Sequence, residues 1–196
     1  MNHFVFSAFV VFIVTLIAAF FFLIKKATAD RLFGFFWACV AFWTLTVGFQ
    51  YQLLLWIPDR IWGWFLHIGC ISVPIVFFHF AVFYCGKMKE LRRAVVIGYC
   101  IALGFVLLNT LTPLFTYGTE YRDHYAYPKP AILYPLYILF FQVFGIWATI
   151  LIVNWRKHLP PAAKKLMNLF LAFHGLAYLG AMDKYLIMFV SRIFPL

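Results

Sequence analysis

The sequence predicts an all-α, polytopic membrane protein whose single domain, residues 1–196, is one bundle of six transmembrane helices. Hydrophobic residues make up 66% of the chain and charged residues 11%, and the mean hydropathy is +0.94. Soluble domains usually contain about 45–50% apolar and about 25% charged residues, so this chain has too few polar side chains to coat a water-soluble globule. Two further observations support this class: long apolar runs alternate with short polar connections, and Lys and Arg concentrate in every other connection.

The apolar runs have lengths suited to helices that cross a hydrocarbon core of about 30 Å. The first run is followed at once by Lys25 and Lys26, whereas a secretory signal peptide carries its positive charges before the apolar run. We therefore expect a true span with an extracytoplasmic amino end. Asp59 is a natural N-cap for the third span. The expected spans are residues 4–24, 32–55, 61–84, 94–115, 131–153 and 166–182, followed by an apolar tail at 185–196.

The net charge of +10 is explained by where the cations lie. The first, third and fifth connections hold 11 of the 16 Lys and Arg residues. By the positive-inside rule these connections face the cytoplasm of a cell whose inner (cytoplasmic) membrane holds the protein. Membrane lipid is an expected partner and nucleic acid is not, because no basic stretch lies outside these connections. The 11 cations are Lys25, Lys26, Arg31, Lys87, Lys89, Arg92, Arg93, Arg156, Lys157, Lys164 and Lys165.

Polar groups within or just outside the membrane are costly there, so each one is a candidate functional residue. We expect a ring of such groups at the outer face, roofed by the Tyr-rich stretch 116–130, to bind a small amphipathic ligand. The tryptophans and tyrosines at this level also fit an ordinary interfacial belt, and Asp183 and Lys184 also fit a simple water boundary. The candidate ligand-binding residues are Gln50, Gln52, Asp59, Arg60, His67, Asp183 and Lys184.

Three residues inside the spans are candidates of another kind. Pro74 removes a backbone hydrogen bond from the third span, so it serves either as a hinge or as a fixed kink. His79 and His174 are intramembrane polar residues, each explained by a functional role or by a hydrogen bond to a neighbouring helix. His67 and His79 lie about 18 Å apart along the helix axis and about 120° around it, so they cannot face one small ligand together.

No catalytic, metal or cofactor constellation is found. A haem between His174 and one of the third-span histidines would require the two axial ligands to lie at matching depth in the membrane. We do not expect this arrangement, and we expect no cofactor. The four cysteines form no CxxC pair, so buried free thiols are the expected state rather than a metal site or disulfides. GxGxxG, P-loop, HExxH and GxSxG motifs are absent from the sequence. We therefore expect this chain not to be an enzyme.

Several stretches follow a pattern known from one family. They are Arg31–Trp37 (RLFGFFW), Ala41-Phe42-Trp43, Pro74–Phe80 (PIVFFHF) followed by Tyr84, and Leu179–Leu186 (LGAMDKYL) with Ile193–Pro195 a few residues on. These stretches resemble the amino-terminal seven-helix sensor region of bacterial and archaeal membrane histidine kinases. The resemblance implies an outer or intramembrane ligand site and dimeric partners in the membrane. A seventh span, the linker, the phosphoacceptor histidine region and the ATP-binding domain have no counterpart here, so kinase activity is not carried over.

The function that we expect is a sensor or receptor module of a two-component signal transduction system. It would bind a small ligand at the outer cavity and signal by helix rearrangement to a homodimer partner or another membrane protein. One alternative is a non-enzymatic subunit of a larger membrane complex, motivated by the small size and short loops. Another is a small transporter, which is disfavoured because no span contains a central acidic residue. A membrane enzyme would need a nucleophile or metal constellation that the sequence lacks.

Overall fold

The computed structural model describes the backbone of residues 3–49, 59–122 and 125–193, and the side chains of residues 6–48, 61, 63–119 and 128–180. In this part of the chain the protein is a helical bundle with one two-stranded hairpin, so the all-α prediction is confirmed. The elements are α1 (His3–Leu23), α2 (Thr28–Phe49), α3 (Asp59–Tyr84), α4 (Met88–Leu111), β1 (Thr116–Arg122), β2 (Tyr125–Pro130), α5 (Tyr134–Trp155), the 3-10 helix η1 (Arg156–His158) and α6 (Pro161–Ile193).

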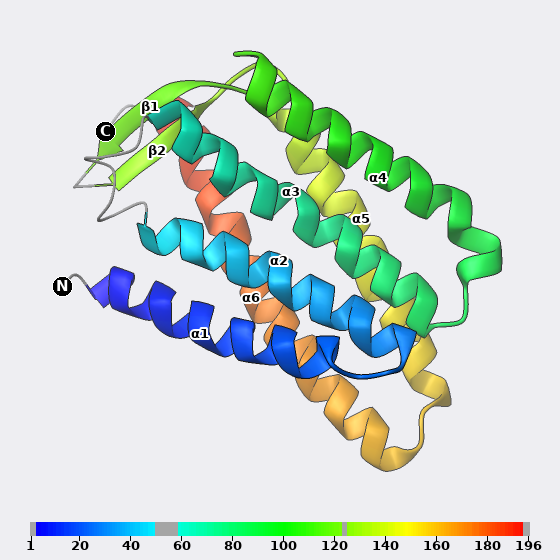
Figure 1. Ribbon diagram of the computed structural model, residues 1–196. Coiled ribbons are helices and arrows are strands. Elements are labelled where there is room, and N and C mark those ends of the chain that lie inside the picture. Colours follow the sequence, from blue (N-terminus) through cyan, green and yellow to red (C-terminus); the bar gives the residue numbers. More distant parts are fainter. Residues whose placement is uncertain (1–2, 50–58, 123–124, 194–196) are drawn as a thin grey trace.

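Helix α3 forms the centre of the bundle. Helices α1 to α4 lie in chain order as one layer, with α5 and α6 behind it (Figure 1). Helix α3 contacts α2, α4 and α5, and 72% of an 18-residue window within Gly63–Tyr84 is buried, against 11% of Phe6–Leu23 in α1. Its fully buried side chains include Ile71, Phe77 and Phe78. The position of every other helix is therefore defined by its contact with α3 or with a neighbour of α3.

Five helical stretches in the described part of the chain are long and apolar enough to cross a membrane. Their length and composition alone support a multi-pass membrane protein. Their exposed residues are also largely apolar, as expected for surfaces that face lipid. These stretches are Phe6–Leu23, Thr28–Gly48, Gly63–Tyr84, Met88–Leu111 and Tyr134–His158.

Several helices extend beyond the expected spans at their charged ends. Helix α2 begins at Thr28 rather than at residue 32, α4 at Met88 rather than at residue 94, and α6 at Pro161 rather than at residue 166. Lys, Arg, Glu and Ala are good helix formers, and proline is favoured in the first helical turn. The apolar run therefore marks only the middle of each helix, and the helix continues into the charged residues.

Helix α6 differs most from its expected bounds. It continues without a break to Ile193, so it does not end at Met182, and residues 185–193 are not a separate tail. Asp183 and Lys184 thus lie within a helix. The physical reason is that neither residue breaks a helix, and the next proline along the chain is Pro195.

The stretch 116–130, which the sequence suggests only as a polar connection, forms an antiparallel hairpin. Strands β1 and β2 pair from Thr116↔Pro130 to Arg122↔Tyr125, with one irregularity after Thr116. The base of the hairpin is closed by the N–H of Ala131, which donates to the carbonyl of Phe115 at 2.9 Å. Tyrosine and threonine favour strands, whereas the proline, glycine and charged residues among them hide the pattern in the sequence.

The connections of the bundle separate into two ends. Residues 24–27, 85–87 and 156–160 connect helices at one end, which we call the basic end, and the hairpin lies at the other (Figure 1). Arg92, at the start of α4, and Arg156, after α5, consequently lie at the same end. The turn between α3 and α4 is closed by the N–H of Lys87, which donates to the carbonyl of Val82 at 2.8 Å. Gly86 has φ +68° there, a left-handed conformation that favours glycine.

Candidate functional site

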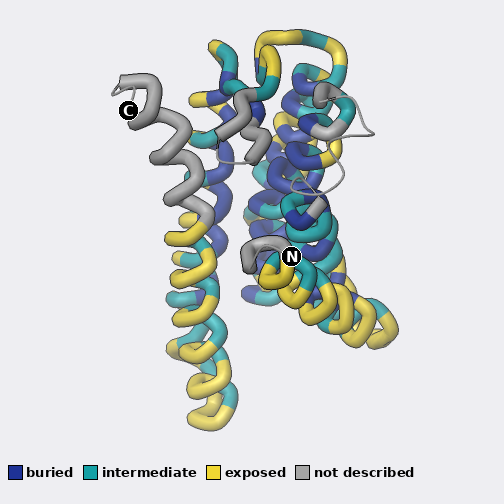
Figure 2. Tube along the Cα trace, turned by 90° about the vertical axis from the view of Figure 1, so that its left-hand side faces the viewer, coloured by how far each residue is buried: buried dark blue, intermediate teal, exposed yellow. Residues whose placement is uncertain are grey.

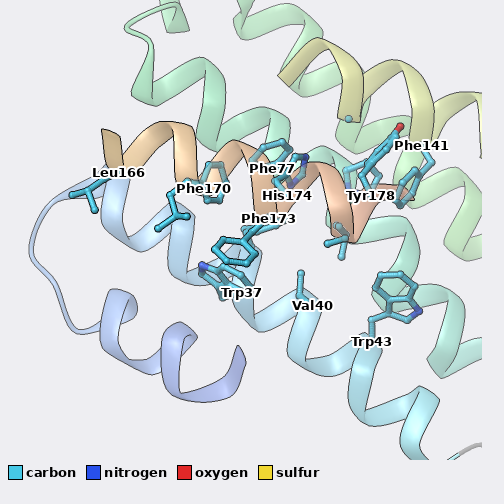
Figure 3. A pocket seen from close by; sticks show the side chains of 16 residues that line it. Trp37, Val40, Trp43, Phe77, Phe141, Leu166, Phe170, Phe173, His174 and Tyr178 are labelled. Carbon is cyan, nitrogen blue, oxygen red and sulfur yellow. The ribbon is translucent and has the colours of Figure 1, made fainter. Parts of the chain in front are cut away.

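A cavity of about 550 Å³ lies between α2, α3, α5 and α6 (Figure 3). Its wall is almost entirely carbon, and none of its lining residues is Lys, Arg, Asp or Glu. Figure 3 shows side chains from α2 and α6 projecting into the space between these helices. The lining residues are Phe36, Trp37, Val40 and Trp43 of α2, Val73, Pro74 and Phe77 of α3, Phe141 and Gly145 of α5, and Leu166, Leu169, Phe170, Phe173, His174, Ala177 and Tyr178 of α6.

Three aromatic side chains hold α6 against the bundle. Phe170, His174 and Tyr178 are four residues apart and therefore share one helix face; we call them the docking ladder. The ring centroid of His174 lies 4.4 Å from that of Phe77 on α3, and the ring centroid of Phe170 lies 6.3 Å from that of Phe77. Phe77 has only 1% of its surface exposed, so the ladder rests on the core of the bundle.

Tyr178, the last residue of the docking ladder along the chain, is held by α5. Its ring stacks on Phe141 with the two centroids 5.7 Å apart, and its hydroxyl donates a hydrogen bond to the side-chain carbonyl of Gln142. Gly145 gives this ring its space, because a Cβ at that position would lie 2.9 Å from Cε2 of Tyr178. This contact between α5 and α6 therefore depends on the absence of a side chain at Gly145.

The cavity is open along one side. Leu166, Leu169 and Phe173 line it, yet 70%, 54% and 64% of their surfaces are exposed. None of the residues 161–180 of α6 is buried, and Figure 2 shows this helix standing apart from the rest of the bundle. The cavity is consequently accessible through the gap between α2 and α6 and is not sealed inside the core.

Two polar atoms in the cavity-lining residues have no hydrogen-bond partner among the described residues. They are Nε1 of Trp37 and Nε2 of His174, and both atoms are buried. A buried polar atom without a partner costs about 1–3 kcal/mol, so either atom would gain from a polar group nearby. The site thus combines an apolar wall with a small number of unsatisfied polar atoms, a combination that is typical of pockets for small ligands.

His67 is not among the described residues that line this cavity. It is 2% exposed, its Nδ1–H donates to the carbonyl of Gly63 at 2.7 Å, and its Nε2 lies 3.4 Å from the hydroxyl of Tyr134. The ring of Phe115 closes the site from the base of the hairpin, with centroids 5.1 Å apart. These bonds and rings make His67 part of the packing that joins α3, α5 and the hairpin, which favours a structural role for this residue.

The other six residues of the predicted outer ring lie outside the part of the chain whose side chains the structure describes. Gln50 and Gln52 lie outside the described residues. Asp59 and Arg60 begin α3, and Asp183 and Lys184 lie in α6, where the backbone is described and the side chains are not.

A second, more polar pocket does lie under the hairpin, with a volume of about 370 Å³. Asn109, 2% exposed, lines it; its Nδ2 donates to the carbonyl of Trp64 at 3.5 Å, and its Oδ1 accepts from Thr116 at 3.4 Å. The other lining residues are Gly63, Pro113, Thr116, Tyr117, Gly118, Thr119 and Pro128. His67, the one predicted outer-ring residue whose side chain is described, is not among them, although the hairpin does cover this pocket.

The three histidines that the sequence predicts within the membrane occupy three separate environments. His67 contacts Tyr134, His174 packs on Phe77, and Nδ1 of half-buried His79 lies 3.1 Å from the hydroxyl of Tyr99 on α4. Each therefore has different neighbours, and the structure does not bring a pair together. Among the described residues, no group of three or more His, Cys, Asp or Glu side chains could hold a metal ion.

The interhelical cavity was missed because its wall is made of residue types that carry no signal in a membrane protein. Trp37, Val40 and Trp43 recur at helical spacing, yet the same spacing is expected for residues that face lipid or a neighbouring helix. Pro74 and His174 are the two predicted residues that the structure places in the cavity wall.

Comparisons of the chain with protein-family models, with curated proteins and with solved structures give no match.

Proposed function

We propose that this protein is a multi-pass membrane receptor that binds a small apolar or amphipathic molecule between α2 and α6. The observation that carries the proposal is the interhelical cavity, one wall of which is α6, a helix with no buried residue between 161 and 180. Its volume of about 550 Å³ lies within the range of about 300–1,000 Å³ that is usual for ligand pockets. This site replaces the outer polar ring that the sequence suggested.

The proposed orientation follows from the charges. With the basic end in the cytoplasm, the hairpin and the amino end of α1 lie outside, as the positive-inside rule favours. Helix α6 then supplies the sixth span, and the docking ladder lies within the membrane. The proposed location is the cytoplasmic membrane, because that is the membrane for which this rule orients helical proteins.

The proposed response is a displacement of α6. This helix is seated by the docking ladder, whereas its cavity-lining neighbours Leu169 and Phe173 face open space. A ligand between α2 and α6 would bind one position of α6 better than another and shift the population toward it. Pro74 lies in the wall at the middle of α3 and has no N–H for the helix ladder, which supports a role as the hinge between the cavity and α3.

The composition of the wall favours a receptor over an enzyme or a transporter. A catalytic site needs a nucleophile beside a base, and the lining residues offer only the His174 imidazole and the Tyr178 hydroxyl, which already donates to Gln142. A transporter of ions or polar solutes needs charged or polar groups along its path, and none of the lining residues is charged. The resemblance to sensor regions of membrane histidine kinases agrees with this choice.

The proposal is tested by measuring the position of α6 with and without a neutral probe. Nitroxide labels at Leu176→Cys on α6 and Leu103→Cys on α4, both exposed positions, report the distance between the helices in neutral phospholipid nanodiscs. For this purpose the four native cysteines are replaced by alanine. We expect octadecan-1-ol to change the distance distribution, because its chain fills the cavity.

Two substitutions on α6 make the test specific to the cavity. Ala177→Phe places a ring in the cavity and should abolish the response, whereas Ala172→Phe makes the same change at an exposed position that does not line it. The proposal would be overturned if octadecan-1-ol left the distance between the two labels unchanged both in the Ala172→Phe variant and in the protein that carries neither substitution.

A further inference from the structure

We infer that the ligand of this cavity is an anionic amphiphile with a single hydrocarbon chain, such as a fatty acid. Its chain would lie between α2 and α6, and its anionic head would lie at the basic end. The inference rests on the proposed function and names the class of ligand for the same site. It is carried by the shape of the cavity, by its open side and by the charges near one of its ends.

The shape of the cavity suits an extended chain. On α6 its lining runs from Leu166 to Tyr178, 12 residues further on, which corresponds to about 18 Å of helix. Along this length the wall is almost entirely carbon, and none of the lining residues carries a charge. A long, narrow apolar space is filled better by one hydrocarbon chain than by a compact polar molecule, because every buried methylene contributes about 0.8 kcal/mol.

The open side gives such a chain a way in. Leu166, Leu169 and Phe173 line the cavity and are exposed on the surface between α2 and α6, in the apolar part of both helices. In a bilayer this surface faces lipid tails. The ligand therefore enters sideways from the membrane, which is where single-chain amphiphiles are concentrated, and its chain does not have to cross a polar surface.

The charges near the cavity determine at which end the anionic head of the ligand lies. The Leu166 end of the cavity is close to the basic end, since α6 begins at Pro161. Lys165, an exposed residue, precedes Leu169 by four residues and Phe173 by eight, so it lies on the helix face that carries these two lining residues. An ammonium group at this position can reach an anionic head whose chain runs along Leu169 and Phe173.

The opposite side of this end is also basic. The turn between α1 and α2 carries Lys25 and Lys26, and the first turn of α2 adds Arg31 and one carboxylate, Asp30, so the net charge of this region is positive. At the far end of the cavity the hydroxyl of Tyr178 is already bonded to Gln142, and none of the described lining residues is a cation. Among the described residues, the cations that can stabilise an anionic head are therefore those of the basic end.

The test compares an acid with the alcohol of the same chain. A stearic acid and an octadecanol, each carrying a diazirine at carbon 10, are photolysed with the protein in neutral phospholipid nanodiscs, and the adducts are mapped by mass spectrometry. We expect saturable adducts on the cavity-lining residues of α2 and α6, which unlabelled stearate displaces. The acid should bind about fivefold more tightly than the alcohol, since one cation near a membrane surface contributes about 1 kcal/mol to binding an anion.

Three variants separate the chain from the head. Lys165→Gln should bring the affinity for the acid down to that for the alcohol, whereas Lys89→Gln, which removes an exposed cation of the same end on α4, should leave it unchanged. Ala177→Phe should remove the saturable adducts of both probes. A lysophosphatidate that competes as well as stearate, with the same dependence on Lys165, would show that a phosphate head serves as well as a carboxylate and would support the inferred class.

The outcomes distinguish this inference from the function on which it rests. Equal saturable labelling by acid and alcohol, unaffected by Lys165→Gln, would overturn the anionic ligand and leave the apolar receptor site intact. Labelling that neither saturates nor depends on Ala177→Phe would overturn both. Saturable labelling by the acid with the expected dependence on Lys165 would support both.

Discussion

Gly145 of α5 lies against the ring of Tyr178 of α6, with no room for a side chain between them. A Cβ at Gly145 would be 2.9 Å from Cε2 and 3.3 Å from the hydroxyl oxygen of Tyr178. The same hydroxyl donates to Gln142, one turn earlier on α5. At this point along the helix, α6 is therefore attached to α5 by a close contact between Gly145 and Tyr178. A substitution that adds one methyl group, Gly145→Ala, tests this contact.

Gly145→Ala is expected to loosen α6. The new methyl group must displace the ring of Tyr178 and weaken its bond to Gln142, and overpacking of this kind costs about 1–3 kcal/mol. We expect a broader distance distribution between nitroxide labels at Leu176→Cys and Leu103→Cys, and a lower free energy of unfolding in a denaturing-detergent titration. Gly175→Ala is the matched control on α6, where a Cβ would meet nothing within 4 Å. Identical results for the two variants would contradict the role of this contact.

Gly98 supports a similar prediction for the core of the bundle. A Cβ at this position on α4 would lie 2.3 Å from Cδ1 of Ile75 and 2.9 Å from the ring of Phe144. Gly98→Ala should therefore separate α4 from α3 and α5 and lower the free energy of unfolding by about 1–3 kcal/mol. Gly104→Ala, on the same helix with open space around it, should be neutral or stabilise by up to about 1 kcal/mol. The prediction fails if both substitutions have the same effect.

The parts of the fold that depend on the apolar runs could be predicted from the sequence. Composition and the alternation of apolar and basic stretches indicate an all-α membrane bundle, and the basic connections do lie at one end. The bounds could not be predicted as well, because lysine, arginine and alanine extend a helix past its apolar part, as at Met88 and Pro161. The hairpin was missed because Gly118, Pro128 and Pro130 interrupt its alternating pattern.

The candidate site was harder to predict than the fold. Intramembrane polarity drew attention to His67, yet its partners, Gly63 four residues earlier and Tyr134 on another helix, satisfy it within the core. The same criterion did find His174, and the missing backbone N–H drew attention to Pro74; the structure places both in the cavity wall. The remainder of that wall is aromatic and aliphatic, and a sequence does not distinguish a side chain that faces a cavity from one that faces lipid.

His67→Ala is expected to destabilise the protein without affecting the cavity. The substitution removes a fully buried ring and its hydrogen bonds to Gly63 and Tyr134, which together cost about 2–4 kcal/mol. The free energy of unfolding should fall accordingly, while the displacement of α6 by octadecan-1-ol persists. His174→Ala is the informative comparison, because it should change the response of α6 with a smaller loss of stability. If the His67→Ala protein is stable but octadecan-1-ol no longer displaces α6, the result would show that His67 takes part in ligand binding.

The basic end should face a single side of the membrane. Lys89, Lys164 and Tyr117 are exposed positions on α4, α6 and the hairpin, respectively. In a protein without other cysteines, a membrane-impermeant maleimide should modify Tyr117→Cys in intact cells, but Lys89→Cys and Lys164→Cys only after the cells are permeabilised. Modification of Lys89→Cys and Lys164→Cys from different sides would show that the helices do not all cross the membrane as proposed.

Cys85, which follows α3 at the basic end, should react slowly and in a strongly pH-dependent way. Burial raises the pKa of this thiol to about 11, an effect that the nearby Lys87 ammonium only partly offsets. Only the thiolate is alkylated, so at pH 7.5 nearly all of Cys85 is in the unreactive protonated form. In a protein that retains Cys85 alone, the rate of reaction with iodoacetamide should rise about tenfold per pH unit from pH 7.5 to pH 9.5, because the thiolate fraction grows in that proportion below the pKa.

A cysteine at exposed position 89, introduced as Lys89→Cys, should instead approach its maximal rate near pH 9, as expected for an unperturbed thiol with a pKa of about 8.5. A plateau at pH 9 for Cys85 as well would mean that water reaches the thiol and that the end of α3 is packed less tightly than its 4% exposure implies.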